Sequence, residues 1–223
     1  EWQCRHQFEL EARSRFRRLA DSLSQHHAPD AIVQLTEKAA ADEDRHGRLC
    51  REIVQFLGAR APEDIPIVAR PVYPEKMSAK SQLLYEVVAM SCVTETLSCT
   101  LLGLMVERTE NSFLKRAMQS ILSDEVGHSR LGWAYLADQM TSGPQRVIAE
   151  YLPAMLASTV HEEIFQPEMA SPMDEALDQL GVLSQAERLK VFIHTMTTVV
   201  FPGLEQFGVD PSAGRTWLME KVG

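Results

Sequence analysis

Residues 39–50 read AAADEDRHGRLC, and residues 121–132 read ILSDEVGHSRLG. In both stretches a glutamate stands three residues before a histidine and directly after an aspartate. The two pairs are Glu43 with His46, and Glu125 with His128. Residues three apart lie on the same face of an α-helix. Each pair therefore presents a carboxylate and an imidazole on one side of a helix.

Hydrophobic residues recur with helical spacing on both sides of these pairs. Asp30 is expected to cap a helix after the Pro29 turn, and Gly58 is expected to end that helix. Residues 58–79 contain four prolines, which predicts a long crossover after which the next helix runs parallel to the second. The predicted helices span about residues 2–27, 31–57, 81–108 and 112–139.

The remaining residues, 142–223, are also predicted to be mainly helical. Ser171 to Asp174 and Ser184 to Glu187 have the spacing of capping boxes. Strand patterns are nearly absent. We therefore predict an all-α protein with a four-helix bundle in residues 1–141. Residues 142–223 are expected to form a helical extension that packs on this bundle as part of a single domain.

Six ionisable residues fall in phase with the apolar stripes of the predicted helices. In the second helix, for example, Glu43 and His46 lie between Ala39 and Cys50 on one stripe. Burying isolated charges costs several kcal/mol unless they are paired or bind cations. The six residues are Glu9, Glu43, His46, Glu95, Glu125 and His128.

The register and charge of these residues indicate a two-metal site. Glu95 lies about 14 residues before the turn between the third and fourth predicted helices, and Glu125 lies about 14 residues after it. Both residues are therefore roughly 21 Å from that turn along their helices. Four carboxylates carry a charge that balances two divalent cations. Carboxylate and imidazole ligands suit iron or manganese, whereas structural zinc more often recruits thiolates.

Further polar residues are candidates for supporting roles. Asp42 and Asp124 are predicted to accept the outer N–H of a ligand histidine; the alternative is a solvated surface aspartate. His161 and Glu162 are candidates for an extra ligand or a proton-transfer group, although a surface histidine is the simpler interpretation. The other histidines before residue 30 are expected at solvent or helix ends: His6, His26 and His27.

The composition narrows the class of protein. The chain has 223 residues, 45% of them hydrophobic, enough for one substantial core. Its net charge of −9 argues against nucleic acid or an anionic membrane as a partner. We find no uninterrupted apolar run of about 18 residues and expect no membrane span. The four cysteines lack Cys-x-x-Cys spacing, which favours reduced thiols in a cytoplasmic protein.

Over about residues 5–140 the pattern resembles the ferritin-like diiron carboxylate superfamily. Its motif is one glutamate from each of two helices and Glu-x-x-His from each of the other two. The resemblance implies a ferritin-like bundle that binds two iron ions, with a Mn/Fe pair as an alternative. It implies single carboxylate ligands at Glu9 and Glu95, bridging or chelating ligands at Glu43 and Glu125, and one imidazole per metal from His46 and His128.

From this resemblance we expect an oxidase or oxygenase that uses O2 and an external electron donor to oxidise a small organic substrate. The extra C-terminal helices are expected to cover a substrate cavity or to form a homodimer interface. One alternative is a ferroxidase or a rubrerythrin-like peroxidase. A second is a helical interaction protein with a structural metal site.

Two details distinguish subgroups of the superfamily. Ile121 stands where arylamine N-oxygenases have an extra histidine, which counts against that subgroup. Tyr135 lies roughly 10 Å along the helix from His128, too far for the radical tyrosine of a ribonucleotide reductase subunit. Small residues near the ligands, including Gly132, leave space for oxygen or allow close helix packing. Three cysteines lie within about two turns of the ligands and are interpreted as small core fillers rather than redox groups: Cys50, Cys92 and Cys99.

Overall fold

The structure, a computed structural model, confirms the all-α prediction within the residues that it describes. These residues form helices and connecting segments without a β-strand. The chain divides into two compact units, Glu1–Pro71 and Val72–Gly223. The described residues are 2–63, 67–68, 70–74, 76–139, 145–160, 162–165, 177 and 179–223.

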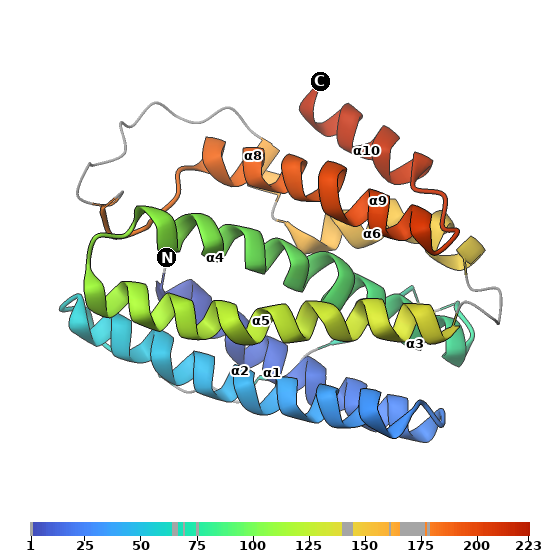
Figure 1. Ribbon diagram of the computed structural model, residues 1–223, viewed down its shortest axis with the longest axis horizontal. Helices are drawn as coiled ribbons and strands as arrows, with labels where there is room; N and C mark the ends of the chain where they lie inside the picture. The colour runs from blue at the N-terminus through green and yellow to red at the C-terminus, as the bar shows by residue number, and fades with distance from the viewer. Residues whose placement is uncertain are drawn as a thin grey trace. The chain divides into compact units, whose positions relative to one another are not determined.

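The first unit is an antiparallel pair of long helices, α1 (Trp2–Gln25) and α2 (Asp30–Phe56), drawn in blue to cyan in Figure 1. The stripe predicted for α2 is buried along most of its length, and it includes both charged positions. The apolar core of this unit is supplied by Leu10, Phe16, Leu19, Leu23, Ile32 and Ile53.

The ends of α2 are set by backbone geometry. Gly58 has a φ of 77°, the left-handed conformation that glycine adopts without steric cost, as predicted for the end of this helix. The predicted cap at Asp30 is wrong. The N-cap is Pro29, which has no side-chain hydrogen bond, while its carbonyl already accepts from the Ile32 N–H at 2.8 Å. The helix therefore starts one residue earlier than a cap at Asp30 would require.

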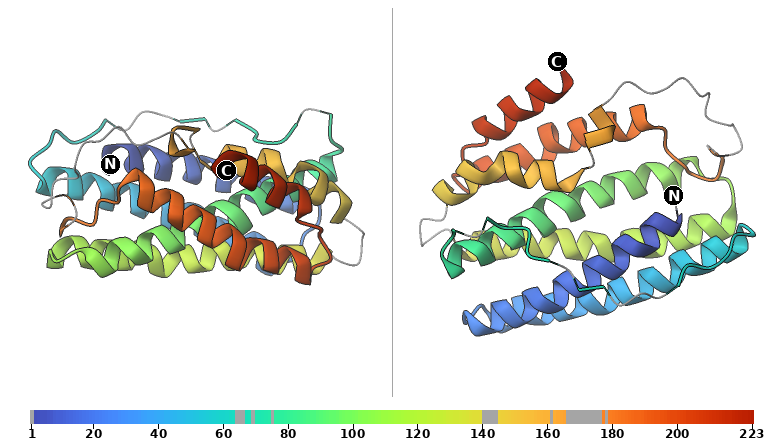
Figure 2. Two further views of the ribbon diagram at one scale, coloured as in Figure 1. Left: turned by 90° about the horizontal axis from the view of Figure 1, so that it is seen from above. Right: turned by 180° about the vertical axis from the view of Figure 1, so that it is seen from behind.

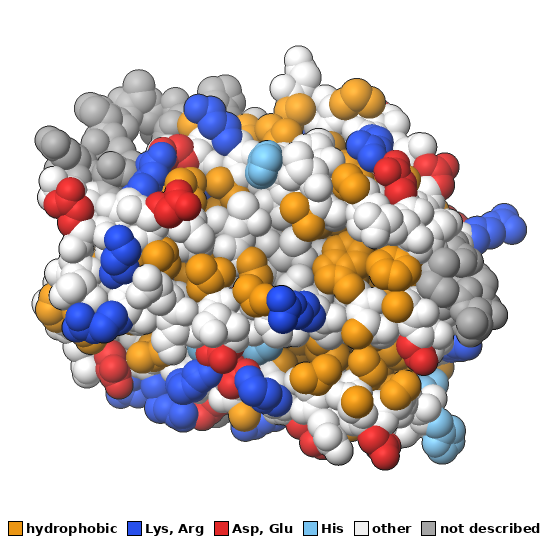
Figure 3. Space-filling view, in the orientation of Figure 1, with side chains coloured by type: hydrophobic (Ala, Val, Ile, Leu, Met, Phe, Trp, Pro, Cys, Tyr) orange, Lys and Arg blue, Asp and Glu red, His pale blue; other side chains and the backbone are white. Residues whose placement is uncertain are grey.

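Ion pairs tie the two helices of the first unit together. Arg13 Nη1 lies 2.6 Å from Asp44 Oδ1, and Arg48 also pairs with Asp44. The hydrogen bond from Arg13 is the largest influence on Asp44 and lowers the pKa of this carboxyl. Figure 3 shows acidic and basic side chains lying close together along the helices of this unit. Charge on this surface is therefore balanced locally.

The second unit is built around one long helix with a wide turn in its middle. α3 (Ala79–Val87), the π-helical stretch η1 (Val88–Glu95) and α4 (Thr96–Arg108) follow one another without a break. α5 (Ser112–Gln139) packs antiparallel against η1 and α4. The Asn111 side chain accepts hydrogen bonds from the Phe113 and Leu114 N–H groups and so caps α5.

The continuous helix Ala79–Arg108 is apolar enough, with a mean hydropathy of 1.6, to cross a membrane by length and composition. However, 61% of the most apolar stretch of this helix is buried inside the protein. The core helix of a soluble protein passes the same test, so this single helix is weak evidence for a span.

The C-terminal elements pack on this long helix within the second unit (Figure 2). α6 contacts α3 and η1, where Tyr151 meets Tyr85 edge to face at 6.3 Å, and α8 contacts α4. The predicted capping box of Ser184 and Glu187 is present; the one predicted for 171–174 lies outside the described residues. The elements are α6 (Gln145–Thr159), η3 (Glu162–Phe165), α8 (Gln185–Thr195), η4 (Met196–Val200), α9 (Phe201–Gln206) and α10 (Ser212–Val222).

The predicted four-helix bundle would combine helices of both units, and the predicted crossover would connect them. Both stay predictions, as does the predicted division of the chain between residues 141 and 142.

The contact between α5 and η1 depends on the missing side chain of Gly132. A Cβ at this position would lie 2.6 Å from Ser91 Cβ and 2.9 Å from the Cys92 backbone nitrogen. Both distances are shorter than van der Waals contact. The sequence left two interpretations of the small residues near the ligands: space for oxygen, or close helix packing. Gly132 serves close helix packing.

We predict that Gly132→Ala destabilises the protein by about 1–3 kcal/mol, because the added methyl must push the η1 backbone away. A thermal melt should show a melting temperature that is lower by roughly 2–4 °C for each kcal/mol of lost stability. Gly127→Ala on the same helix is the matched control, since nothing lies within 4 Å of its added Cβ. Equal melting temperatures for the two variants would contradict the packing role of Gly132.

Candidate metal centre

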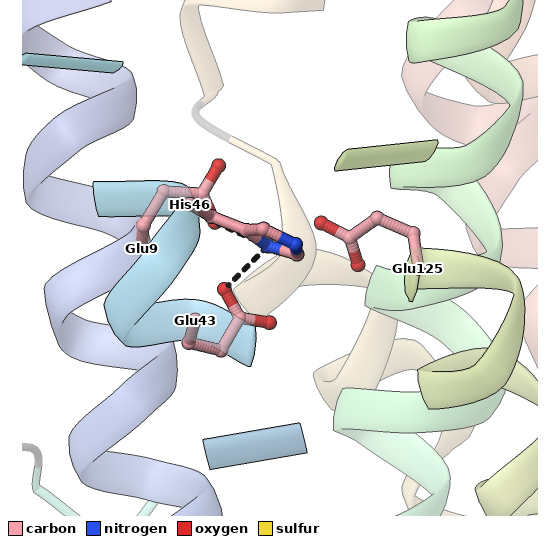
Figure 4. A group of neighbouring side chains, drawn as sticks. All are labelled: Glu9, Glu43, His46 and Glu125. Carbon is pink, nitrogen blue, oxygen red and sulfur yellow. Dashed lines mark ion pairs between the residues drawn. The ribbon is translucent and has the colours of Figure 1, made fainter. Parts of the chain in front are cut away.

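Three of the predicted ligands come together in the first unit. Glu9 lies on α1, and Glu43 and His46 lie on α2; all three are buried. Each offers a ligand atom within 4.8 Å of the others. His46 Nδ1 is 3.4 Å from Glu43 Oε2 and 3.9 Å from Glu9 Oε2. Figure 4 draws these side chains, together with Glu125 of α5. We call Glu9, Glu43 and His46 the first cluster.

The other three predicted ligands come together in the second unit. Glu95 is the last residue of η1, and Glu125 and His128 lie one turn apart on α5. Their ligand atoms also lie within 4.8 Å of one another, and all three side chains are buried. His128 Nδ1 is 3.3 Å from Glu125 Oε2. We call Glu95, Glu125 and His128 the second cluster.

The first cluster is held by a close contact between α1 and α2 beside His46. His6 Nδ1 lies 2.8 Å from the carbonyl oxygen of Gly47. A carbonyl can only accept, so Nδ1 carries the proton and donates it. A Cβ on Gly47 would lie 3.3 Å from Leu10 Cδ2, which shows how closely α1 approaches α2 here.

His6 was predicted near solvent or a helix end, and this prediction is wrong. Its side chain is buried, with 1% of its surface exposed. His6 lies three residues before Glu9 and therefore on the same face of α1. The same helical phase that identified Glu9 as a core residue applies to His6 as well.

The second cluster is positioned by the π-helical turn and by a hydroxyl pair. A π-helix has a wider turn than an α-helix and often occurs at functional sites. Just after η1, the Thr96 hydroxyl lies 2.7 Å from the Ser129 hydroxyl of α5. Thr96 adjoins Glu95 and Ser129 adjoins His128, so this hydrogen bond joins the two helices directly beside the cluster.

The chemistry of both clusters fits a divalent first-row metal ion. Each combines two buried carboxylates with one imidazole, and its ligand atoms are close enough to share a cation. Two carboxylates in an apolar interior repel each other and lose their hydration. A divalent cation would neutralise both charges. A neutral imidazole can offer Nδ1, the nitrogen that faces a carboxylate in both clusters.

The two predicted supporting aspartates differ in their surroundings. Asp42 is buried, and its oxygens lie 2.5 Å from Lys38 Nζ and 3.1 Å from Arg45 Nη2. Asp124 is half-buried on α5. Their predicted hydrogen bonds to the ligand histidines stay predictions. His161 lies outside the described residues, and of Glu162 the structure describes only the backbone in η3.

Other titratable side chains, buried or half-buried, lie close to the second cluster. Cys99 follows Glu95 by one turn, and burial, with the charges of Glu125 and Glu95, raises its pKa to about 12. Burial alone raises the pKa of the Cys92 thiol. Burial also raises the pKa of the Tyr135 hydroxyl, and the charge of Asp138 adds to this shift. The thiolate is the form of cysteine that reacts and binds metals. Cys92 is fully buried, which agrees with the predicted core filler, whereas Cys99 is only half-buried.

The buried carboxylate of Glu86 was not singled out from the sequence. It lies in α3 within the continuous apolar run before η1, and only 2% of its surface is exposed. Its sequence neighbours are apolar on every side, and this could have indicated its burial.

No model of a known protein family matches this chain, and a search of curated proteins finds no significant similarity. The clusters themselves therefore provide the evidence for function.

We predict that His6→Leu destabilises the protein by about 1–3 kcal/mol, because the carbonyl of Gly47 loses a buried donor. His6→Asn should retain most of the stability, since the Asn amide nitrogen occupies nearly the position of Nδ1. His6→Gln places its amide nearer to the position of Nε2 and should not rescue. Chemical denaturation measures all three variants. If Gln rescued as well as Asn, the bond to Gly47 would not be the cause.

We predict that Cys4, which is exposed, reacts with a maleimide near neutral pH well before Cys50, Cys92 or Cys99. Burial excludes the reagent from Cys50 and Cys92, and the raised pKa of Cys99 leaves little thiolate. Peptide mass spectrometry after timed labelling measures each site, with denatured protein as the control in which all four react. Labelling of Cys99 as fast as Cys4 would contradict this.

Proposed function

We propose that the two clusters together bind two iron ions and that the protein is a nonhaem diiron oxidase or oxygenase. The observation that carries the proposal is the repeated donor set: a single glutamate and a Glu-x-x-His pair, buried, in each unit. The proposal includes a ferritin-like bundle in which the four ligand-bearing helices surround the metals, and in which Glu43 and Glu125 bridge or chelate them.

The donor types support iron or manganese over a structural zinc ion. Four carboxylates and two imidazoles suit Fe(II) or Mn(II), because carboxylates prefer hard cations and imidazoles suit borderline ones. The charge of four carboxylates equals that of two divalent ions. Two iron ions would supply the electrons that reduce O2, and an external donor would restore them.

The residues of the chain have three roles in this proposal. The carboxylates would balance the charge of the metals, the imidazoles would each supply a nitrogen ligand, and the apolar core would exclude water. In the second unit, residues 83–93 are buried without interruption. Exclusion of water protects a reactive oxidant from side reactions. A small organic molecule is the proposed substrate.

We predict that the protein takes up about two Fe(II) ions per chain under anaerobic conditions, as the donor set requires. Iron uptake should raise the melting temperature by several degrees, since binding at 100 times Kd stabilises by about 2.7 kcal/mol. Subsequent exposure to O2 should give a transient absorption in stopped-flow measurements. Glu43→Ala and Glu125→Ala should abolish the iron uptake, the rise in melting temperature and the transient absorption.

The matched control is Glu37→Ala, which removes an exposed glutamate from the same helix as Glu43. It should behave as wild type. No iron uptake by the wild type, or uptake that Glu43→Ala and Glu125→Ala leave unchanged, would overturn the diiron proposal. Steady accumulation of an Fe(III) mineral without oxidation of any organic compound would instead indicate a ferroxidase.

A further inference from the structure

Arg5 lies one helical turn before Glu9 on α1, and the two side chains form an ion pair. Arg5 Nε is 2.8 Å from Glu9 Oε1, and the side chains are 16% and 6% exposed. An ion pair with so little exposure is weakly screened by solvent. A guanidinium also stays charged at every pH at which the protein is folded. Arg5 is therefore a permanent positive charge beside the first cluster.

The two oxygens of Glu9 face different partners. Oε1 is the oxygen beside Arg5, whereas Oε2 lies 3.9 Å from His46 Nδ1 and so faces the other members of the first cluster. A carboxylate can bind a cation through one oxygen or through both. An oxygen held against a guanidinium is a poor second ligand, because the metal and Arg5 would compete for it.

We propose that Arg5 is a positioning residue that holds Glu9 as a one-oxygen metal ligand through Oε2 and limits the metal affinity of the first cluster. The two carboxylates of this cluster carry a charge of −2, and the guanidinium reduces it to −1. The inference rests on the proposed function, since it assumes that the first cluster binds a metal. It adds that this metal is held less tightly than its donors would otherwise allow.

The test is an anaerobic calorimetric titration with Co(II), which needs no turnover. The step that Glu9→Ala weakens identifies the metal bound at the first cluster. In Arg5→Met, the affinity of that step should rise by about tenfold or more, because a repelling charge is removed and Oε1 is released. Arg5→Lys keeps the charge and should stay near wild type. Arg13→Met, which breaks the ion pair with Asp44 on the same two helices, is the control and should leave the affinity unchanged.

A double-variant comparison separates the action of Arg5 through Glu9 from a general field effect. In a Glu9→Ala background, Arg5→Met should raise Co(II) affinity by clearly less than in the wild type, because only the repelling charge is removed and no Oε1 is released. Unchanged or weaker binding in Arg5→Met, or an equal gain in the Glu9→Ala background, overturns the inference. If the wild type binds no Co(II), the proposed function fails, and the inference with it. Arg5→Gln, which removes the charge but keeps a donor, replaces Arg5→Met in both comparisons if the latter does not fold.

Discussion

The structure depends on the burial of carboxylates in an apolar helical interior. Each unit contains two glutamates of this kind next to a histidine. The net stability of a folded protein is about 5–15 kcal/mol, and the effective cost of burying one ion is several kcal/mol. In the first cluster, Arg5 offsets part of this cost by pairing with Glu9. A cation at each cluster would offset more of the cost, which links metal binding to folding stability.

The two units hold their clusters in different ways. In the first, α1 and α2 approach closely at Gly47, and His6 hydrogen-bonds to the backbone next to the ligand His46. In the second, α5 meets the backbone of η1 at Gly132, and the hydroxyls of Thr96 and Ser129 join the helices. In both units the supporting contact adjoins a ligand in the sequence. Small changes in helix packing would therefore move the ligands directly.

The correct predictions from the sequence follow helical periodicity, and Glu86 was missed where periodicity carries no information. His6 was mispredicted although its helical phase matches that of Glu9. Glu43 and His46 were identified because α2 has one buried stripe, and Gly58 marks the end of that helix. In the long helix of the second unit, periodicity could not distinguish a buried face from an exposed one. Residues 83–93 are buried on every side, and a π-helical turn shifts the phase. The pairing of Arg5 with one oxygen of Glu9 is a matter of side-chain conformation, which the spacing alone does not determine.

The π-helical turn η1 has a consequence for how this helix tolerates changes in length. A π-turn contains one more residue than an α-turn, as if a single residue had been inserted into a regular helix. Loss of one residue between Val88 and Val93 would restore a regular helix and keep α3 and α4 in their present phase. The same loss within α3 would find no extra residue to remove and would rotate everything beyond it by about 100°. Glu95 would then turn away from Glu125 and His128, so η1 is the part of this helix that can lose a residue without redirecting this carboxylate.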